Sequence, residues 1–293
     1  MKVIAKQRDA LTLDCPAKVN LFLSVKGKRR DGYHDLINVM QKVTLFDRVV
    51  LEKKSSPGID LWCSREDIPP EKNLVFLAAR SFFERASLEA RLKISLTKKI
   101  PVGGGLGGGS SDAAGVLRGL NILFGCPLGF PDLKSVADDL GSDVPFFLRK
   151  GTWVMEGKGD TFSRCIKSRT FYFLLFFFGH KSHTKSVYEK HLSSGRKDLC
   201  SLSRFSASLR RGRGSRVRKE MKNDLLPAFF SAYPKQKQIY IDLKKKMCKN
   251  LFLSGSGATF FSIFDTRSAM TEAFSSLHPS IQQHVFQAKS FLE

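Results

Sequence analysis

The segment PVGGGLGGGSSDAA, which runs from Pro101 to Ala114, carries six glycines among the seven residues from Gly103 to Gly109. Glycine loses more backbone freedom on folding than any other residue, so such a cluster needs a compensating role. An alternating strand pattern precedes it at 91–98, and apolar residues at helical spacing follow it. Backbone amides at a helix start, joined by glycine amides that no Cβ covers, bind anions. The segment therefore predicts a phosphate-binding loop, and a flexible glycine–serine linker is the alternative.

Three common phosphate-binding classes do not fit this loop. A Walker loop needs a lysine directly after its glycines, and none follows here. Gly103, Gly105 and Gly108 match the GxGxxG pattern of dinucleotide-binding folds, but so dense a glycine run matches it almost automatically. The protein-kinase motifs HRD and DFG do not follow the glycines. The loop therefore belongs to another class of phosphate site.

The elements that must position this loop alternate between strands and helices. Asn73 is a suitable N-cap for a helix over LVFLAARSFFERA, and PDLKSVADDLG predicts a short helix that ends at Gly141. VNLFLSV has strand alternation, which predicts that one face carries Lys18, Asn20, Phe22 and Ser24. The pattern predicts an α+β protein with two domains, residues 1–158 and residues 159–293.

Composition narrows the class of protein. The chain has 293 residues, 42% of them hydrophobic, and its longest apolar run, FYFLLFFF at 171–178, is too short to cross a bilayer and predicts a buried strand. The N-terminus lacks the apolar core of a secretory signal. Six cysteines lie far apart without a CxxC pair, which argues against zinc and disulfides and favours reduced thiols. We expect a cytoplasmic protein without a membrane partner.

The net charge of +22 is unusual, and much of the excess is local. Residues 196–222 carry ten Lys or Arg against two acidic residues. We interpret this basic stretch as a solvated, mobile connection between structured elements, and an RNA-contacting arm is the alternative. Phe205 is the only aromatic residue in it, so it lacks a platform on which bases could stack. We therefore expect no specific nucleic-acid partner.

Several motifs together resemble one family, the GHMP superfamily of sugar and small-alcohol kinases. The glycine loop resembles its second signature, PAKVNLFLSV its first and LSGSGATFF its third, in the family's order. The segments GKRRDGYHDL, GLGGGSSDAA and GSDVPFF further resemble the branch of the methylerythritol phosphate route to isoprenoids, whose substrate carries cytidine diphosphate. The resemblance implies an N-terminal ribosomal-protein-S5-domain-2-like domain, a C-terminal ferredoxin-like domain, and an active site between them.

The resemblance also implies roles for individual residues in the transfer of a phosphoryl group from ATP. Asp143 matches the catalytic aspartate, which accepts or orients the substrate hydroxyl, and Lys18 matches the catalytic lysine. Without the family, the residues around Asp143 would favour an aspartate that caps a turn before Val144 and Pro145, and Lys18 could be a solvated strand end. Mg²⁺ is expected to arrive with ATP, and no residues are dedicated to it. The residues expected to contact ATP are Pro101, Val102, Gly103, Gly104, Gly105, Leu106, Gly107, Gly108, Gly109, Ser110, Ser111, Asn73 and Lys98.

Recognition of the cytidine-bearing substrate is expected from a second group of residues. Tyr33 and His34 match positions that stack on the cytosine and read its edge, and Tyr188 matches a second aromatic position. The residues expected to contact substrate are Asn20, Tyr33, His34, Tyr188, Gly255, Ser256 and Gly257. Asn223 and Asp224 are expected to be structural, and the chain to be a monomer or weak homodimer. A kinase for homoserine, mevalonate or a sugar, and a nucleic-acid-binding protein, remain alternatives.

Overall fold

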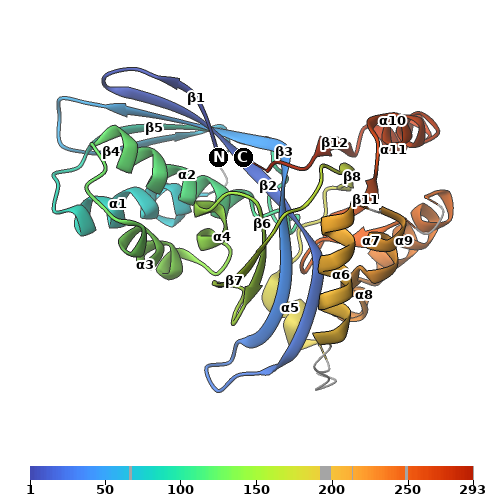
Figure 1. Cartoon of the computed structure of the whole chain (residues 1–293). Coiled ribbons are helices and arrows are strands. Elements are labelled where there is room, and N and C mark those ends of the chain that lie inside the picture. The colour runs from blue at the N-terminus through green and yellow to red at the C-terminus, as the bar shows by residue number, and fades with distance from the viewer. Residues whose placement is uncertain (66–67, 192–198, 213, 248–249, 293) are drawn as a thin grey trace.

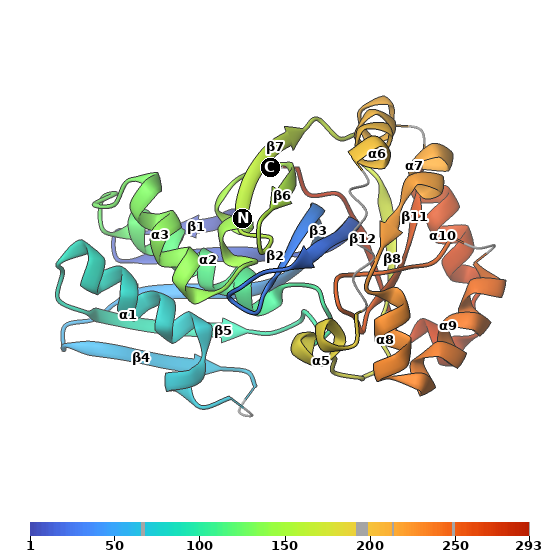
Figure 2. The ribbon, with the colours of Figure 1, turned by 90° about the horizontal axis from the view of Figure 1, so that it is seen from below.

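The chain forms two α+β halves that lie side by side (Figure 1). The computed structural model describes residues 1–65, 68–191, 199–212, 214–247 and 250–292. The first half is built on a sheet that includes the long strands β2 and β3, and the second on a smaller sheet around β8. The views in Figures 1 and 2 place helices α1 to α4 on the first half and helices α8 to α11 on the second.

In the described part of the chain, eight strands form the first sheet. Strands β1, β2, β3, β5 and β4 are neighbours in that order, while β6 pairs with β3, β7 with β6, and β9 with β2. β2 and β3 run antiparallel, whereas β4–β5 and β2–β9 are parallel pairs. The strand bounds are β1 Lys2–Lys6, β2 Ala10–Lys28, β3 His34–Lys53, β4 Gly58–Cys63, β5 Arg91–Thr97, β6 Thr152–Glu156, β7 Thr161–Ile166 and β9 Lys222–Asn223.

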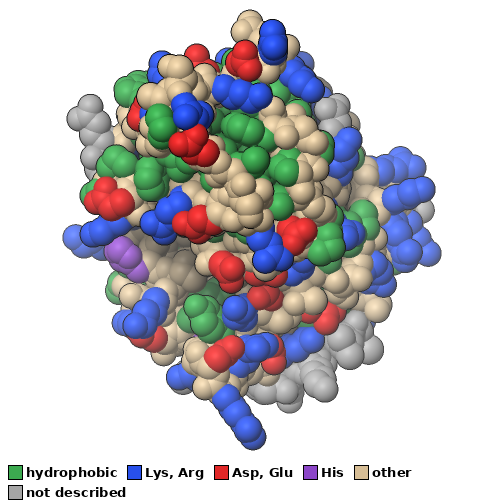
Figure 3. Space-filling model, turned by 90° about the vertical axis from the view of Figure 1, so that its left-hand side faces the viewer, with side chains coloured by type: hydrophobic (Ala, Val, Ile, Leu, Met, Phe, Trp, Pro, Cys, Tyr) green, Lys and Arg blue, Asp and Glu red, His purple; other side chains and the backbone are tan. Residues whose placement is uncertain are grey.

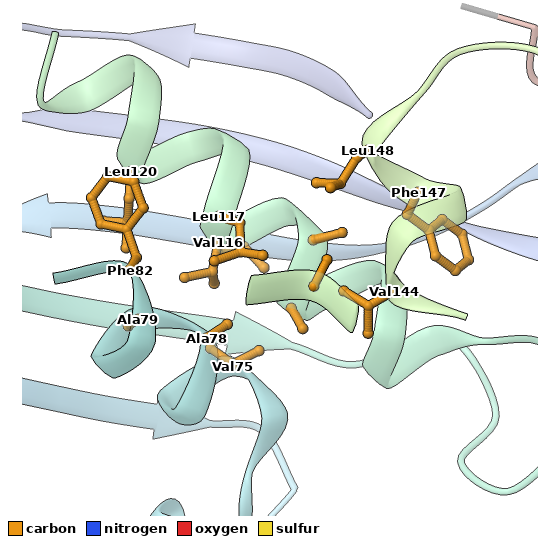
Figure 4. Packing of buried hydrophobic residues seen from close by; sticks show 14 of the residues in the cluster. Val75, Ala78, Ala79, Phe82, Val116, Leu117, Leu120, Val144, Phe147 and Leu148 are labelled. Atoms are coloured by element: carbon orange, nitrogen blue, oxygen red, sulfur yellow. The ribbon is translucent and has the colours of Figure 1, made fainter. Parts of the chain in front are cut away.

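Four helices cover one face of this sheet and enclose the first core (Figure 4). As the sequence predicts, Asn73 caps α1, because its side chain accepts a hydrogen bond from the Val75 amide. Apolar residues of α1, α2 and α4, such as Phe82, Leu120 and Phe147, pack together there without contact with solvent. The bounds are α1 Leu74–Ala86, α2 Gly108–Leu123, α3 Phe130–Leu140 and α4 Val144–Leu148, with a 3₁₀ turn at Pro70–Lys72.

The second sheet is antiparallel, with the order β10-β11-β8-β12. The apolar run at 171–178 supplies its central strand β8, which confirms the buried strand predicted there. Helices α8, α9 and α10 contribute to the core beside this sheet. The bounds are β8 Tyr172–Phe176, α5 Thr184–Glu189, α8 Leu226–Ala232, α9 Pro234–Lys246, β10 Phe252–Leu253, β11 Phe260–Phe264, α10 Arg267–Ser275, α11 Pro279–Gln282 and β12 Val285–Lys289.

The basic stretch differs from the mobile connection that we expected. It forms helix α6, Leu199–Arg211, and helix α7, Gly214–Glu220, whereas residues 196–198 and 213 lie outside the described residues. Phe205 is fully buried and its ring lies 5.5 Å from that of Phe22. Phe205 therefore anchors α6 in a core cluster shared by strands of both sheets, which is why the stretch is ordered.

A bulge in β2 corrects the predicted strand face. The pairing with β3 shifts between Asn20 and Phe22, so Leu21 is an extra residue. Lys18 and Asn20 do share a face, but Phe22 turns into the core cluster with Phe205. Leu23 takes its place beside Asn20 in the lining of a cavity. Strict alternation cannot foresee such an inserted residue.

The predicted domain boundary at residue 158 stays a prediction. Strand β7 follows that boundary and still pairs with the first sheet, and the chain first enters the second sheet at Tyr172. No helix in the described ranges is both long enough and apolar enough to pass through a bilayer.

Candidate active site

A cavity of about 1170 Å³ is lined by residues of both halves. Cavities that bind one small molecule measure roughly 300–1000 Å³, so this one has room for more than one. All predicted site residues line it except Ser111, which is fully buried, and Gly257, which is buried against Phe229. Residues that are far apart in the sequence, such as Lys18, Asp143 and Tyr188, are thus brought together.

The glycine loop is held entirely through its carbonyl groups. Five consecutive carbonyls accept hydrogen bonds, and the donors are, in loop order, the amide of Ser182, the amide of Thr259, the hydroxyl of Ser254, the amide of Lys18 and the amide of Ser111. These bonds are 2.9–3.1 Å long and reach the carbonyls of residues 103 to 107. Within the described chain, no amide of residues 103–107 donates to another backbone or side-chain group.

The amides of this loop are therefore free to bind an anion. The first amides of α2 also lack helical acceptors, as at every helix start, and the helix dipole adds partial positive charge. Gly105 and Gly107 have φ angles of +73° and +68°, which other residues rarely adopt. The loop has the properties of a phosphate site, and its many anchors argue against a flexible linker.

A side chain at Gly107 would collide with other residues of the protein. A Cβ there would lie 3.0 Å from Cγ and 3.1 Å from Cε of Lys18, and 3.1 Å from the ring of Phe147. Glycine at this position therefore also leaves room for the lysine. The side chain of Lys18 occupies the space beside the loop that a Cβ on Gly107 would need.

Lys18 pairs with Asp143 inside the cavity. The Lys18 Nζ lies 3.2 Å from Asp143 Oδ2, and the side chains are 4% and 31% exposed. Asp143 is the N-cap residue of α4, yet its side chain makes no capping hydrogen bond. The alternatives of a turn-capping aspartate and a solvated strand-end lysine therefore do not hold.

Two asparagines orient the lysine from behind. Lys18 Nζ donates to Asn20 Oδ1 at 2.7 Å, and Asn20 Nδ2 donates to Asn38 Oδ1 at 2.9 Å. The hydroxyl of Ser254 also donates to Asn20 Oδ1, at 3.3 Å. All of these side chains are buried, and the contact of Asn20 with substrate stays a prediction. Sequence reasoning missed Asn38, because its position opposite Leu23 follows from the bulge in β2.

Aromatic and histidine rings line another part of the cavity. The rings of His34 and Tyr188, which come from different halves, lie 5.1 Å apart, and His191 lies 6.4 Å from His34. Burial, His191 and Lys28 lower the pKa of His34, which favours the neutral form of its ring. Burial and the charge of Asp143 raise the pKa of the Tyr188 hydroxyl. Tyr33 is 58% exposed, beneath the ammonium of Lys158.

Lys98 lines the cavity but its ammonium group is already paired. It contacts Asp47 and lies 2.6 Å from Asp112, and both carboxylates are buried. Burial opposes its charge, but these carboxylates raise the pKa of Lys98. Burial also raises the pKa of Asp112. Asp47 further accepts from the amides of Lys99 and Ile100, so the cluster fixes the chain that leads into the glycine loop.

The remaining predicted residues support the backbone around the cavity. Asn223 donates to the carbonyls of Leu253 and Gly255, each at 2.8 Å, and Asp224 accepts from Val25 in β2. This confirms their structural role. Ser256 contacts the Thr184 hydroxyl at 3.0 Å, at the start of α5.

No group of three or more metal-ligating side chains occurs among the residues that the structure describes. The carboxylate of Asp143 and the hydroxyl of Ser110 are oxygen donors in the cavity lining near the glycine loop. Mg²⁺ keeps several waters and binds proteins through one or two side chains together with phosphates. The cavity thus suits a magnesium ion that is bound mainly by a nucleotide.

Both halves match known families. Residues 73–151 match the GHMP kinases N terminal domain and residues 205–280 match the GHMP kinases C terminal domain. A homoserine kinase from Cytophaga hutchinsonii has the same fold, with a TM-score of 0.70 over 99% of this chain and 96% of that one, at 17% identity. The fold and the site together place the chain in the class of the GHMP kinases. The family matches and the shared fold also confirm the fold that the sequence predicts.

Closer relatives narrow the class. Two 4-diphosphocytidyl-2-C-methyl-D-erythritol kinases, from Citrifermentans bemidjiense and Geobacter sulfurreducens, are 36% and 35% identical over 90% of this chain and 92% and 93% of theirs. A crystal structure of 4-(cytidine 5'-diphospho)-2C-methyl-D-erythritol kinase has a TM-score of 0.81 and 29% identity over 96% of this chain and 99% of that one. The chain belongs to the family of 4-diphosphocytidyl-2-C-methyl-D-erythritol kinases.

The close approach at Gly105 generates a prediction. A Cβ there would lie 2.5 Å from the Ser254 carbonyl oxygen and 2.6 Å from that of Gly257, and its φ is left-handed. Gly105→Ala should therefore lower the free energy of unfolding by about 2 kcal/mol, because backbone atoms must shift. Chemical denaturation measures this. At Gly109 a Cβ meets only Leu74, at 3.5 Å, so Gly109→Ala should leave stability within about 0.5 kcal/mol. If both substitutions lowered the free energy of unfolding equally, the close approach at Gly105 would be contradicted.

Proposed function

We propose that the chain transfers the γ-phosphoryl group of ATP to the 2-hydroxyl of 4-diphosphocytidyl-2-C-methyl-D-erythritol, a step in isoprenoid precursor synthesis. The observation that carries the proposal is the Lys18–Asp143 pair beside a loop of unbonded amides, inside one large cavity. Family membership supports the substrate, since the names of relatives state it.

The reaction needs little covalent chemistry from the protein. The amides of the loop and of the α2 start would bind the ATP phosphates. Asp143 would accept the proton of the substrate hydroxyl as its oxygen bonds to the γ-phosphorus. The bond from that phosphorus to the β–γ bridging oxygen breaks, and ADP leaves with the electron pair. The partly exposed carboxylate of Asp143 can be reached by substrate, as this role requires.

Lys18 would stabilise both reacting groups. Its ammonium lies 3.2 Å from the Asp143 carboxylate, and its carbon chain occupies the space that a Cβ on Gly107 would need. A buried cation at this place compensates the negative charge of the phosphoryl group in transfer. The asparagine pair behind it limits the directions in which the ammonium can point.

The rings around His34 would bind the cytidine base. His34 and Tyr188 offer aromatic faces for stacking, and a neutral imidazole can both donate and accept on the edge of the base. Lys28, Lys158 and Lys185 line the same cavity and suit the substrate's diphosphate. Mevalonate and homoserine, the alternative acceptors, offer no base for these rings.

Mg²⁺ would enter with ATP, and Ser110 and Asp143 are the residues that could contact it. When bound, it would neutralise charge on the phosphates. A cytoplasmic location and a monomeric or weakly dimeric state remain parts of the proposal. The free thiols of Cys15, Cys63, Cys126 and Cys165 support a reducing compartment.

The experiment that tests the proposed function compares acceptors. With ATP and Mg²⁺, ADP release should be at least about 100-fold faster with 4-diphosphocytidyl-2-C-methyl-D-erythritol than with homoserine or mevalonate, because only the first fills the aromatic subsite. A coupled ADP assay measures the rates, and phosphorus NMR identifies the phosphorylated hydroxyl. Comparable turnover of mevalonate or homoserine would reject the proposed substrate.

The proposed role of Asp143 as the general base is tested by replacing it with asparagine, which has the same shape. Asp143→Asn should lower kcat at least about 100-fold while the KM for ATP changes less than about threefold, because the amide cannot take a proton. The matched control is Asp139→Asn, a change at an exposed aspartate outside the cavity lining. A variant of Asp143 with more than a tenth of the original kcat would exclude it as the base.

Asn38 is predicted to be a positioning residue for Lys18. Asn38→Leu removes the acceptor of the buried Asn20 amide, which costs roughly 1–3 kcal/mol, and kcat should fall about tenfold or more. The KM values for both substrates should change less than about threefold. Asn38→Asp keeps the acceptor and should recover most of kcat. If both variants lose kcat equally, or if KM rises with unchanged kcat, Asn38 does not act through Lys18.

A further inference from the structure

Helices α6 and α7 present a basic face that the proposed kinase reaction does not use. We define this basic face by eight residues, none of which lines the cavity: Arg164, Arg169, Arg204, Arg210, Arg211, Arg216, Arg218 and Lys219. Arg164 of β7 donates to Ser206 of α6 at 3.1 Å, which joins β7 to the helices. The side chain of Arg169 lies over Gly212 at the end of α6. The residues thus form one continuous surface.

The packing of the two helices turns these cations toward solvent. Leu202, Phe205 and Leu209 of α6 and Val217 of α7 are buried in the core cluster shared by the two sheets. The opposite side of each helix therefore faces water, and Arg210, Arg211, Arg216 and Lys219 are exposed on it. Helix α6 lies at the front of the molecule in Figure 1, and this front forms the right-hand edge of Figure 3. Lys and Arg side chains are crowded at that edge.

Few acidic groups balance this charge. Glu220 lies 3.5 Å from Arg204, and Asp265 lies 3.6 Å from Arg218. Arg210, Arg211, Arg216 and Lys219 form no salt bridge with any residue that the structure describes. Cations in the last turn of a helix interact favourably with the helix dipole. This interaction explains only the positions of Arg210, Arg211, Arg218 and Lys219, and one cation in each helix would be enough for it.

The chemistry of the surface selects among anionic partners. Helices that lie on membranes insert large apolar side chains, and none of the exposed large hydrophobic residues of the described chain belongs to α6 or α7. Single strands bind by stacking on aromatic rings, and Phe205 is buried. Arginine forks match phosphate oxygens, and a 13-residue helix is about 20 Å long, which spans several phosphates of a duplex.

We propose that the basic face of α6 and α7 binds the phosphate backbone of a nucleic-acid duplex, without sequence preference. Binding of this kind depends on released counterions, so it weakens steeply with salt. The face lies outside the cavity, so a bound duplex and the kinase substrates occupy different surfaces. The proposal is independent of the kinase function and gives the basic stretch a role.

The experiment compares two triple variants of equal net charge. Arg210→Gln, Arg211→Gln and Arg216→Gln together remove three of the eight charges of the basic face, while Lys235→Gln, Lys237→Gln and Lys245→Gln neutralise three exposed lysines of α9 outside the cavity lining. Fluorescence anisotropy with a labelled 20-base-pair RNA duplex, between 50 and 200 mM KCl, measures Kd and its salt dependence. The same measurement is made with a DNA duplex of the same sequence, with one of the single strands and with phosphatidylserine vesicles.

The triple variant of the basic face should weaken duplex binding at least tenfold and lower the slope of log K against log salt by about 2 to 3, or about 0.9 for each lost phosphate contact. The α9 variant should stay within about threefold of the unchanged protein, and kcat should be unchanged in both. Equal losses in the two variants, tighter binding to vesicles or single strands, or no duplex binding by the unchanged protein would overturn the proposal. If the triple variant fails to fold, Arg211→Gln alone should lower the slope by about 1, and no change would overturn it equally.

Discussion

The structure depends on how the glycine loop uses its backbone. Each peptide group has one donor and one acceptor, and in this loop the acceptors of residues 103–107 are all satisfied by the protein. The donors are consequently left for a ligand, at the start of helix α2. Left-handed glycines such as Gly105 make this separation possible, because the chain can reverse its peptide direction at every second residue.

Lys18 links the glycine loop to the carboxylate of Asp143. Its amide donates to the carbonyl of Leu106, and its ammonium lies between Asp143 and Asn20. One residue of β2 thus fixes the loop through its main chain and the carboxylate through its side chain. The spacing between the glycine loop and the Asp143 carboxylate is therefore set within a single residue of the long strand β2.

The sequence predicted the parts of the site that depend on local chemistry. The glycine loop, the Asn73 cap, and the shared face of Lys18 and Asn20 follow from propensity and spacing, and the family resemblance added Asp143 and Tyr188. Contacts between distant segments were not accessible. Asn38 and Asp47 lie on β3 and reach the site only through strand pairing and folding, and nothing in the sequence around them marks a function. The helix around Phe205 was obscured by its charge, because its few apolar residues carry the packing.

Three of the five donors that hold the loop belong to the second half of the chain: Ser182, Ser254 and Thr259. A fragment limited to the first half would contain helix α2 but lack strand β9 of the first sheet and the groups that hold residues 103–105. The shape of the glycine loop is therefore a joint property of both halves. Any rotation between them would be transmitted to the glycine loop through hydrogen bonds of about 3 Å, so the seam between the halves and the loop form one mechanical unit.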